Sequence, residues 1–221
     1  SRDAAYRRRA LDLVEAGEHR LAVPLLKRAV AHDPTDGEAL SYLGLALLHE
    51  GDPTAALSPL EAAAELHPDE ALGQWNIAAA AKASGQMCKS YLALVRYLAL
   101  DDDFRGSRAR RRLAKRFVTG YEALFREKYP GIPLDELVEG ERLFERAYAD
   151  MERGRYAEAV RGFRDVIARI PTHHPSWGNL GAAELALGDR DEAARCLRRA
   201  LELKPDYDVA RDNLEMLETR H

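Results

Sequence analysis

The side chains that could do chemistry in this sequence are few, and none stands in a known catalytic or metal-binding arrangement. His173 and His174 are adjacent and lie between prolines, with no cysteine or carboxylate at the spacing of a metal ligand. Cys88 and Cys196 have no histidine near them in the sequence. No glycine-rich phosphate loop and no nucleophile elbow occurs. We therefore interpret the histidines as turn residues and predict no catalytic residue, no metal and no cofactor.

A basic run is the strongest charge feature of the sequence. Residues 105–116, RGSRARRRLAKR, hold seven basic side chains in twelve positions. Such a run could bind anionic lipid, nucleic acid or an acidic protein. The candidate anion-binding residues are Arg108, Arg110, Arg111 and Arg112. The alternative is a solvated helix face, or one paired with the nearby acids Asp101 to Asp103.

The composition indicates a chain that can bury a sizeable core and carries balanced charge. Of 221 residues 46% are hydrophobic, and 33 basic against 37 acidic residues leave a net charge of −4. That balance argues against nucleic acid as the main partner of the whole chain. Two cysteines make no disulfide framework, no apolar run has membrane-spanning length, and no secretory signal precedes the first repeat. We expect a cytoplasmic location, and a start near a repeat boundary is compatible with a piece of a longer protein.

One spacing pattern organises the chain, and residues 174–207 show it most clearly. Within a unit of 34 residues, positions 4, 7, 8, 15, 20, 24, 27 and 32 are Trp177, Leu180, Gly181, Gly188, Ala193, Leu197, Ala200 and Pro205. Small residues at positions 8 and 20 would let two antiparallel helices cross closely. Gly188 would end the first helix in a left-handed cap, and Pro205 would stop the second.

This pattern resembles the tetratricopeptide repeat (TPR), a helix–turn–helix unit of 34 residues. The resemblance implies an all-α solenoid, a right-handed superhelix of such repeats. Four segments follow from the register: residues 3–104 as an N-terminal array of three repeats, 105–139 as a basic linker helix or degenerate repeat, 140–207 as a C-terminal array of two repeats, and 208–221 as a capping helix. Apolar periodicity predicts one helix from about 107 to 128 and another from about Leu134. Tyr97 occupies position 27, where a small residue is usual, so we expect it to hold the next helix away.

The resemblance also implies a binding groove, because positions 2, 5, 6, 9, 12 and 13 of each repeat face the inner surface in this family. The candidate partner-binding residues are Arg7, Leu11, Tyr42, Leu45, Leu48, His49, Trp75, Asn76 and Lys82 in the first array, and Phe144, Tyr148, Asn179 and Asn213 in the second. A lining of this mostly apolar and aromatic kind fits a partner helix or extended peptide. The alternative is that these side chains touch one another, or that the central helix covers them. Acidic residues are more frequent in the second array, which would suit a basic ligand.

Two known modes of the family were compared with these positions. A clamp for a terminal carboxylate is not supported, since Leu11, Tyr42, Leu72 and Asn76 stand at clamp positions. Asn76, Asn179 and Asn213 at position 6 could hold a peptide backbone through their amides, although asparagine is also the family's usual residue there.

The function predicted from the sequence is therefore a non-enzymatic adaptor that binds a protein or peptide segment in its groove. Two alternatives stay open: a substrate-recruiting module of a larger enzyme such as a glycosyltransferase, and anion recognition by the basic helix. For the second, a membrane surface is a possible partner only through residues 105–116. The partner, the pathway and the oligomeric state are not indicated by the sequence.

Overall fold

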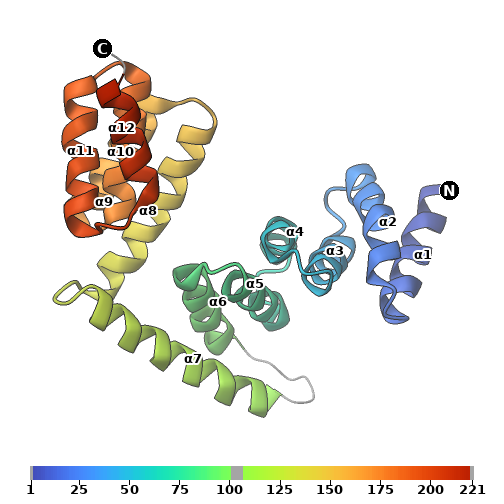
Figure 1. The fold of residues 1–221 in the computed structure, drawn as a ribbon. Coiled ribbons are helices and arrows are strands. Elements are labelled where there is room, and N and C mark those ends of the chain that lie inside the picture. The colour runs from blue at the N-terminus through green and yellow to red at the C-terminus, as the bar shows by residue number, and fades with distance from the viewer. Residues whose placement is uncertain (1, 101–106, 220–221) are drawn as a thin grey trace. The chain divides into compact units, whose positions relative to one another are not determined.

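The computed structural model describes residues 2–100 and 107–219, and these residues form α-helices without a strand (Figure 1). In chain order the helices are α1 (Arg2–Glu15), α2 (His19–His32), α3 (Gly37–His49), α4 (Pro53–Leu66), α5 (Ala71–Ala83), α6 (Met87–Ala99), α7 (Ser107–Lys128), α8 (Leu134–Glu152), α9 (Tyr156–Arg169), α10 (His174–Leu187), α11 (Arg190–Leu203) and α12 (Asp208–Thr219). The helices predicted to cover 107–128 and to begin at Leu134 are confirmed.

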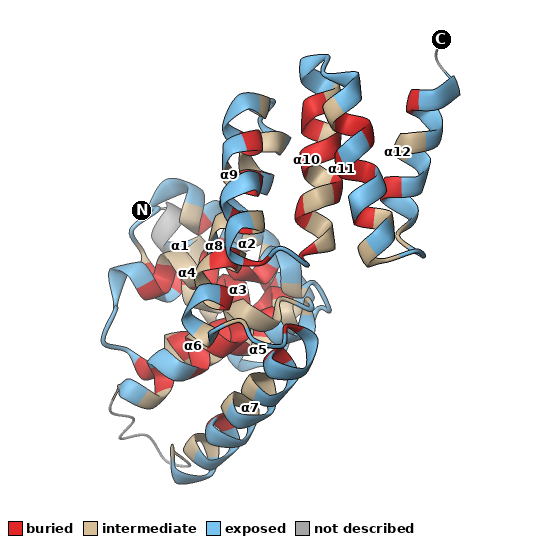
Figure 2. Cartoon of the chain, turned by 90° about the vertical axis from the view of Figure 1, so that its left-hand side faces the viewer, coloured by how far each residue is buried: buried red, intermediate tan, exposed pale blue. Residues whose placement is uncertain are grey.

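The chain divides into two compact units, which we call unit 1 (Ser1–Tyr121) and unit 2 (Glu122–His221). The division falls inside α7, whose first part belongs to unit 1 and whose last turns belong to unit 2. Both units are built from antiparallel helix pairs: α1/α2, α3/α4 and α5/α6 in unit 1, and α8/α9 and α10/α11 in unit 2. Figure 2 shows the buried residues concentrated along these helices.

Local sequence sets where each helix begins and ends. Gly188 ends α10 with a φ of +92°, a left-handed conformation that glycine adopts without strain. Asp36, Asp52 and Asp189 precede α3, α4 and α11, and each carboxylate accepts a hydrogen bond from a backbone N–H three residues on. Such caps satisfy donors that the first helical turn leaves unpaired. The helix boundaries therefore follow from residues within one turn of them.

Small residues at positions 8 and 20 allow the paired helices to cross closely, as the sequence predicts. A Cβ added to Gly44 on α3 would lie 2.4 Å from Cγ of Leu60 and 3.1 Å from the carbonyl oxygen of Ala56 on α4. A Cβ added to Gly181 on α10 would likewise lie 2.7 Å from Cγ of Leu197 on α11. Such distances leave no room for a side chain, so each helix pair can pack this closely only because these two positions are glycine.

In unit 1 the pairs stack in chain order, with α2 against α3 and α4 against α5. The first helices α1, α3 and α5 also contact one another in turn, which places them along one face of the stack. The first part of α7 joins the same apolar cluster through Ala114, Phe117 and Val118. Unit 1 is therefore closed at its C-terminal end by a helix that belongs to no recognisable repeat.

Tyr97 and α7 share one apolar cluster, but in the described residues the backbone of α7 does not approach α5 or α6 closely, which agrees with the expectation from the bulk of tyrosine at this position. Its side chain is fully buried in the cluster that also holds Ala114 of α7, and its ring lies 5.4 Å from the ring of Trp75. Arg111 of α7 donates to the carbonyl oxygens of Leu98 and Leu100 at the end of α6, both at 2.8 Å. The tyrosine fits because its ring packs on the tryptophan ring of α5.

In unit 2 the stack runs from α8 through α11 and ends in α12, which contacts both α10 and α11. Ala210 and Leu217 of α12 are buried against the α10/α11 pair, and Arg190 of α11 donates to the carbonyl oxygen of Leu217. A helix predicted after the last repeat is thus present as α12, and its role as a terminal cap stays a prediction.

Candidate partner-binding groove

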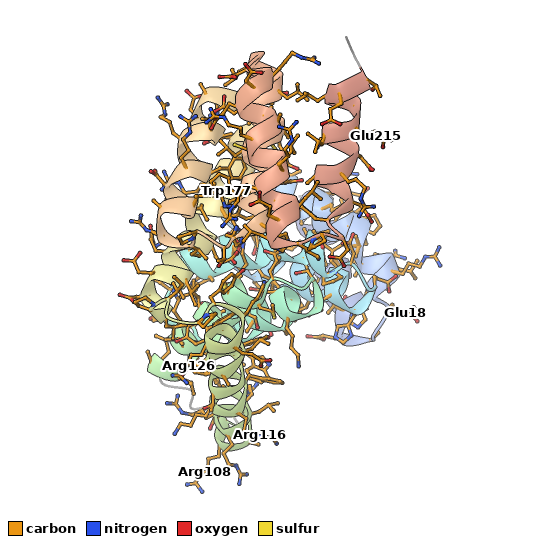
Figure 3. All side chains as sticks on the ribbon, turned by 60° about the vertical axis from the view of Figure 1, so that its left-hand side comes forward. Glu18, Arg108, Arg116, Arg126, Trp177 and Glu215 are labelled. Atoms are coloured by element: carbon orange, nitrogen blue, oxygen red, sulfur yellow. The ribbon has the colours of Figure 1, made fainter. Side chains whose placement is uncertain are left out.

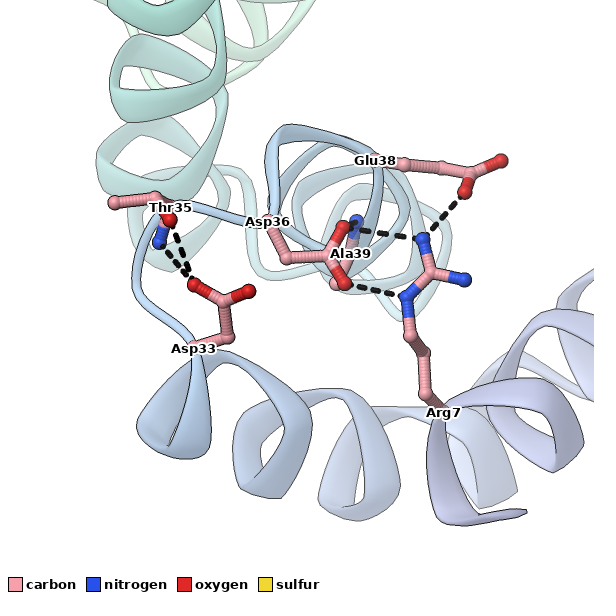
Figure 4. A network of polar contacts seen from close by, with 6 residues as sticks. All are labelled: Arg7, Asp33, Thr35, Asp36, Glu38 and Ala39. Atoms are coloured by element: carbon pink, nitrogen blue, oxygen red, sulfur yellow. Dashed lines mark hydrogen bonds and ion pairs between the residues drawn. The ribbon is translucent and has the colours of Figure 1, made fainter. Parts of the chain in front are cut away.

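The first of the predicted partner-binding residues is Arg7 on α1, and its guanidinium is held by two acidic residues (Figure 4). It donates through Nε to Oδ2 of Asp36 and through Nη2 to Oδ1 of Asp36 at 3.2 Å and Oε2 of Glu38 at 2.6 Å. Asp36 also caps α3 by accepting from the N–H of Ala39 at 3.0 Å. Arg7 therefore ties α1 to the N-terminus of α3.

The charges in this cluster stabilise one another. Hydrogen bonds from Arg7, followed by the capping N–H of Ala39, hold the pKa of Asp36 below its ordinary value. The same carboxylate and that of Glu38 raise the pKa of Arg7. The cluster is partly exposed, with the Arg7 side chain 36% exposed, so solvent screens it and its contribution to stability is modest.

A first pocket of about 390 Å³ lies between α3 and α5, and we call it the α3–α5 pocket. Its lining consists of Gly37, Glu38, Ser41, Tyr42, Leu45, His67, Glu70 and Asn76. Three predicted partner-binding residues, Tyr42, Leu45 and Asn76, thus share one hollow. Two carboxylates and several hydroxyl, ring and amide groups make this pocket mixed in polarity.

A second pocket of about 420 Å³ lies between α5, α6 and α7, and we call it the α5–α7 pocket. Its lining is Trp75, Ala78, Ala79, Lys82, Ala83, Ser90, Leu94, Leu113 and Phe117. Trp75 and Lys82 were predicted from their repeat positions, and both stand here. The lining is almost entirely carbon and contains no carboxylate.

Two cations accompany the aromatic rings of the α5–α7 pocket. The ammonium of Lys82 lies 3.8 Å from the ring centroid of Phe117, and the guanidinium carbon of Arg110 lies 6.0 Å from that of Trp75. A cation over a ring face is attracted by the ring's negative electrostatic potential. Trp75 and Lys82 are therefore in contact with α7. This contact corresponds to the alternative, given from the sequence, that the central helix covers the predicted lining. The α5–α7 pocket nevertheless stays open between the helices.

The remaining predicted residues of unit 1 lie outside both pockets. Leu11 and Leu48 are half-buried and pack against the apolar core. His49 is exposed, and its ring stacks on that of His19 with centroids 4.3 Å apart and planes at 6°. The structure thus brings together five of the nine predicted residues of the first array and leaves four to pack elsewhere, Arg7 included.

In unit 2 the corresponding aromatic residues mostly pack on one another. The ring of Phe144 lies 5.7 Å from that of Phe163 and 5.1 Å edge-on from that of His173. Tyr148 is 42% exposed, with its ring 6.2 Å from Phe144. Phe144 is therefore mainly a core residue, whereas Tyr148 keeps much of its ring in water.

The two adjacent histidines have separate structural roles. His173 is buried and caps α10, with Nδ1 2.7 Å from Oγ of Ser176. His174 packs edge-on against Tyr207 at 5.0 Å, and burial together with the charge of Lys204 lowers its pKa to about 4. His173 therefore lies at the end of the turn before α10, as interpreted from the sequence, whereas His174 is the first residue of the helix.

Asn179 and Asn213 are half-buried on α10 and α12. Asn76 lines the α3–α5 pocket in unit 1. Only Asn179 and Asn213 therefore belong to the same unit, and the peptide-holding role of these amides stays a prediction.

The basic residues of α7 divide into two kinds. Arg111 is tied to α6 and Arg110 lies at the ring of Trp75, as described above. Arg108, Arg112 and Lys115 are exposed and, with Arg111, line a shallow depression of about 490 Å³. Figure 3 shows the side chains of Arg108 and Arg116 extending away from the helix. The sequence analysis considered the basic run as a single surface, but in the structure its basic residues have different surroundings.

Apart from Trp75 and Lys82, sequence reasoning missed the lining of the α5–α7 pocket, including Ser90, Leu113 and Phe117. The last two were visible as an apolar stripe on a helix with basic neighbours. That Leu113 and Phe117 would pack beside α5 could not be predicted, because α7 does not follow the repeat register.

The surroundings of Cys196 make its thiol unreactive. Cys196 is buried, and burial together with Glu192 raises the pKa of its thiol to about 12, which disfavours the nucleophilic thiolate. Within residues 2–100 and 107–219 no group of three histidine, cysteine or acidic side chains is placed to hold a metal ion. In the same residues no helix is both long enough and apolar enough to cross a membrane.

Antiparallel helix pairs, left-handed glycines between the two helices of a pair and first helices that contact one another along one face define a helical repeat protein. Tetratricopeptide repeat models match residues 7–71 and 174–207. The chain therefore contains tetratricopeptide repeats.

Known proteins resemble parts of the chain. Superkiller complex protein 3 of Mus musculus is 31% identical over 100 residues, which are 45% of this chain and 6% of that protein. Cellulose synthase operon protein C of Escherichia coli K12 is 40% identical over 77 residues, 34% of this chain and 7% of that protein. The chain therefore spans less than a tenth of the length of these curated relatives. The structure of YrrB, described as a TPR protein with an unusual peptide-binding site, aligns with 95% of this chain and 90% of its own at 16% identity and a TM-score of 0.44.

Proposed function

We propose that this chain is a non-enzymatic protein-interaction module and that the groove of unit 1 binds a segment of a partner protein. The observation that carries the proposal is the α5–α7 pocket, a hollow of about 420 Å³ lined by Trp75, Phe117 and aliphatic side chains. A concave apolar surface of this kind on a helical repeat usually marks a binding site. The α3–α5 pocket lies on the same helix α5 and extends the surface that a peptide could contact.

The energetics favour a side chain of the partner as the occupant. Displacing water from apolar surface is worth roughly 25 cal/mol per Å². Tryptophan is also among the residues whose truncation most weakens interfaces. Trp75 is half-buried, so one part of its ring is fixed by Tyr97 while the rest faces the pocket. A ring held in this way loses little conformational entropy on binding.

The test compares groove variants with a matched variant outside the groove. Short peptides would be selected from a random display library with the intact chain, and their affinities measured by fluorescence anisotropy. Leu45→Glu together with Trp75→Glu should weaken binding by at least about tenfold, because a carboxylate would have to be desolvated in each pocket. Leu21→Glu is the control, since Leu21 is 57% exposed on α2 and lines neither pocket.

Circular dichroism would establish that both variants keep their helical content. If selected peptides bind the groove variant as tightly as the native chain, the groove of unit 1 is not the binding site. If the library yields no peptide at all, peptide binding by this chain is refuted.

A second candidate function rests on the exposed cations of α7. Arg108, Arg112 and Lys115 line one depression, and no carboxylate in residues 2–100 and 107–219 lies in ion-pair contact with them. By contrast Arg195, Arg198 and Arg199 of α11 each pair with a glutamate. This difference supports anion binding by α7.

The depression of α7 is tested by neutralising its three outward cations. Glutamine at Arg108, Arg112 and Lys115 should lower the salt concentration that elutes the chain from heparin. Glutamine at Arg195, Arg198 and Arg199 removes the same charge elsewhere and should change elution less. Equal shifts would attribute heparin binding to net charge.

The alternative that this chain is a substrate-recruiting module of a larger enzyme stays a prediction.

A further inference from the structure

We propose that the α5–α7 pocket selects partner segments in which a bulky apolar side chain stands directly beside a carboxylate, and that Lys82 binds this carboxylate. The inference rests on the proposed function, since it names the chemistry of the segment that unit 1 binds. It assigns the selecting role to α7, a helix outside the repeat register, together with the third helix pair.

The apolar half of the preference follows from the lining of the pocket. Ala78, Ala79 and Ala83 form a floor without bulk, and Trp75, Leu113 and Phe117 supply larger walls. A space of about 420 Å³ exceeds what a single methyl or hydroxymethyl group can fill. A leucine, methionine or phenylalanine side chain would bury far more apolar surface there than a small or polar one, and so would gain more free energy.

The acidic half follows from the polar groups at the pocket. The hydroxyl of Ser90 donates to the carbonyl oxygen of Ala78 at 3.0 Å and accepts from Tyr121 at 3.2 Å, so its proton is already used. Lys82 is exposed, and its ammonium is held 3.8 Å from the ring centroid of Phe117. It is therefore the donor that a ligand at the pocket can reach. With no carboxylate in the lining, the local charge is positive.

The neighbouring α3–α5 pocket has the opposite charge character. Glu38 and Glu70 line it, and although Arg7 binds Glu38, no basic side chain other than His67 is part of the lining. An acidic residue of the partner is therefore favoured at the α5–α7 pocket and disfavoured at the α3–α5 pocket. This difference sets the orientation in which a charged segment can lie along α5.

The experiment is a charge swap read on a peptide array. The probes are cellulose-bound glycine–serine peptides in which two adjacent central positions run through all amino acids. The native chain should bind most strongly where leucine, methionine, phenylalanine or tryptophan stands beside aspartate or glutamate. Replacing the acid by its amide in soluble versions of the best peptides should weaken binding about fivefold to tenfold at low salt and less at high salt.

Lys82→Glu should move the preferred neighbour of the apolar residue from aspartate and glutamate to lysine and arginine. Lys115→Glu is the matched control, because it makes the same charge change on the part of α7 that lines the other depression. Ala79→Phe fills the floor of the pocket and should abolish the apolar preference. A switch in preference cannot arise from loss of folding, so the reading does not depend on stability.

The possible results separate this inference from the proposed function. If strong spots are lost in Leu45→Glu/Trp75→Glu but show no preference for an acidic neighbour, the groove binds peptides and the inference is wrong. The same holds if Lys82→Glu and Lys115→Glu change the array equally. If no spot depends on the groove residues, both the proposed function and the inference fail.

Discussion

Units 1 and 2 are built from the same repeat, yet their first helices present different surfaces. In unit 1, Trp75 and Tyr42 each line a pocket, with cations at one pocket and carboxylates at the other. In unit 2, Phe144 packs on Phe163 and His173, and Tyr207 packs on His174. The comparison teaches that the repeat pattern specifies the scaffold, whereas the side chains packed beside a groove position decide whether that position is available.

The helix that follows each stack adds to this difference. In unit 1 the first part of α7 contributes Leu113 and Phe117, which wall a hollow against α5. In unit 2, α12 buries Ala210 and Leu217 on the α10/α11 pair. One terminal helix therefore creates a pocket and the other covers a face, although both present an apolar stripe in the sequence.

The largest effect is expected from filling a helix crossing in one unit only. Gly44→Leu would drive a side chain into Leu60 and the backbone of α4, and should lower the free energy of unfolding of unit 1 by about 3 kcal/mol. Urea unfolding would be followed by Trp75 fluorescence in a Trp177→Phe background and by Trp177 fluorescence in a Trp75→Phe background. Gly120→Ala is the control, because nothing lies within 4 Å of its added Cβ, and it should stabilise by about 0.5 to 1 kcal/mol. If the free energy of unfolding falls equally at both tryptophans, the two units unfold together.

A smaller loss of stability is expected when the ring of Tyr207 is removed from unit 2. Tyr207 covers Gly178, where an added Cβ would lie 2.6 Å from its ring, and its own ring packs on His174. Tyr207→Ala should destabilise unit 2 by about 2 kcal/mol, since the ring is only partly buried. It should also raise the pKa of His174 toward 6.5, because burial is the main cause of the lowered value. An unchanged titration of His174 by NMR would contradict the covering role of Tyr207.

Breaking the cluster around Arg7 should cost about 1 kcal/mol, as expected for a partly exposed ion pair with hydrogen bonds. The change is Arg7→Gln, which leaves Asp36 as the cap of α3 but removes the tie to α1. Arg8→Gln is the control, because Arg8 is exposed on the same helix. If Arg7→Gln and Arg8→Gln lower the thermal midpoint of unit 1 equally, the effect is due to net charge and not to the ion pair.

A further prediction concerns pH, because His174 and Asp36 both lose stability as pH falls, but over different pH ranges. The pKa of His174 is about 4 in the folded chain and 6.5 ordinarily, so the unfolded state binds a proton first and unit 2 loses stability as pH falls from 6.5 to 4. Asp36 has a pKa below its ordinary 3.8, so its contribution persists through that window and is lost only at lower pH. Urea midpoints at both tryptophans should diverge between pH 7 and 5. His174→Gln should remove the divergence, and an unchanged divergence would refute this cause.

Much of the fold could be predicted because its signals are local. The glycine at position 15 and the caps Asp36 and Asp189 act within one turn, and the spacing of Gly181 and Ala193 encodes a crossing between consecutive helices. The helices at 107–128 and from Leu134 followed from periodicity for the same reason. The division into an array, a linker and a second array stays a prediction.

The site was less predictable because it depends on contacts between segments far apart in sequence. Position within a repeat nominated Trp75 and Lys82, but not that Phe117 would lie under the ammonium of Lys82. It also could not reveal that Arg7 would be bound by Asp36, or that Phe144 would pack into a core.

The amino-acid sequence alone therefore specified the family, the helices and the faces on which binding residues should stand, because repeat register and helix periodicity are properties of neighbouring residues. Which of those positions stay open was decided only in three dimensions. A groove position is available or filled according to the bulk and charge of whatever side chain packs beside it, and in this protein those side chains include residues of α7 and aromatic residues of unit 2.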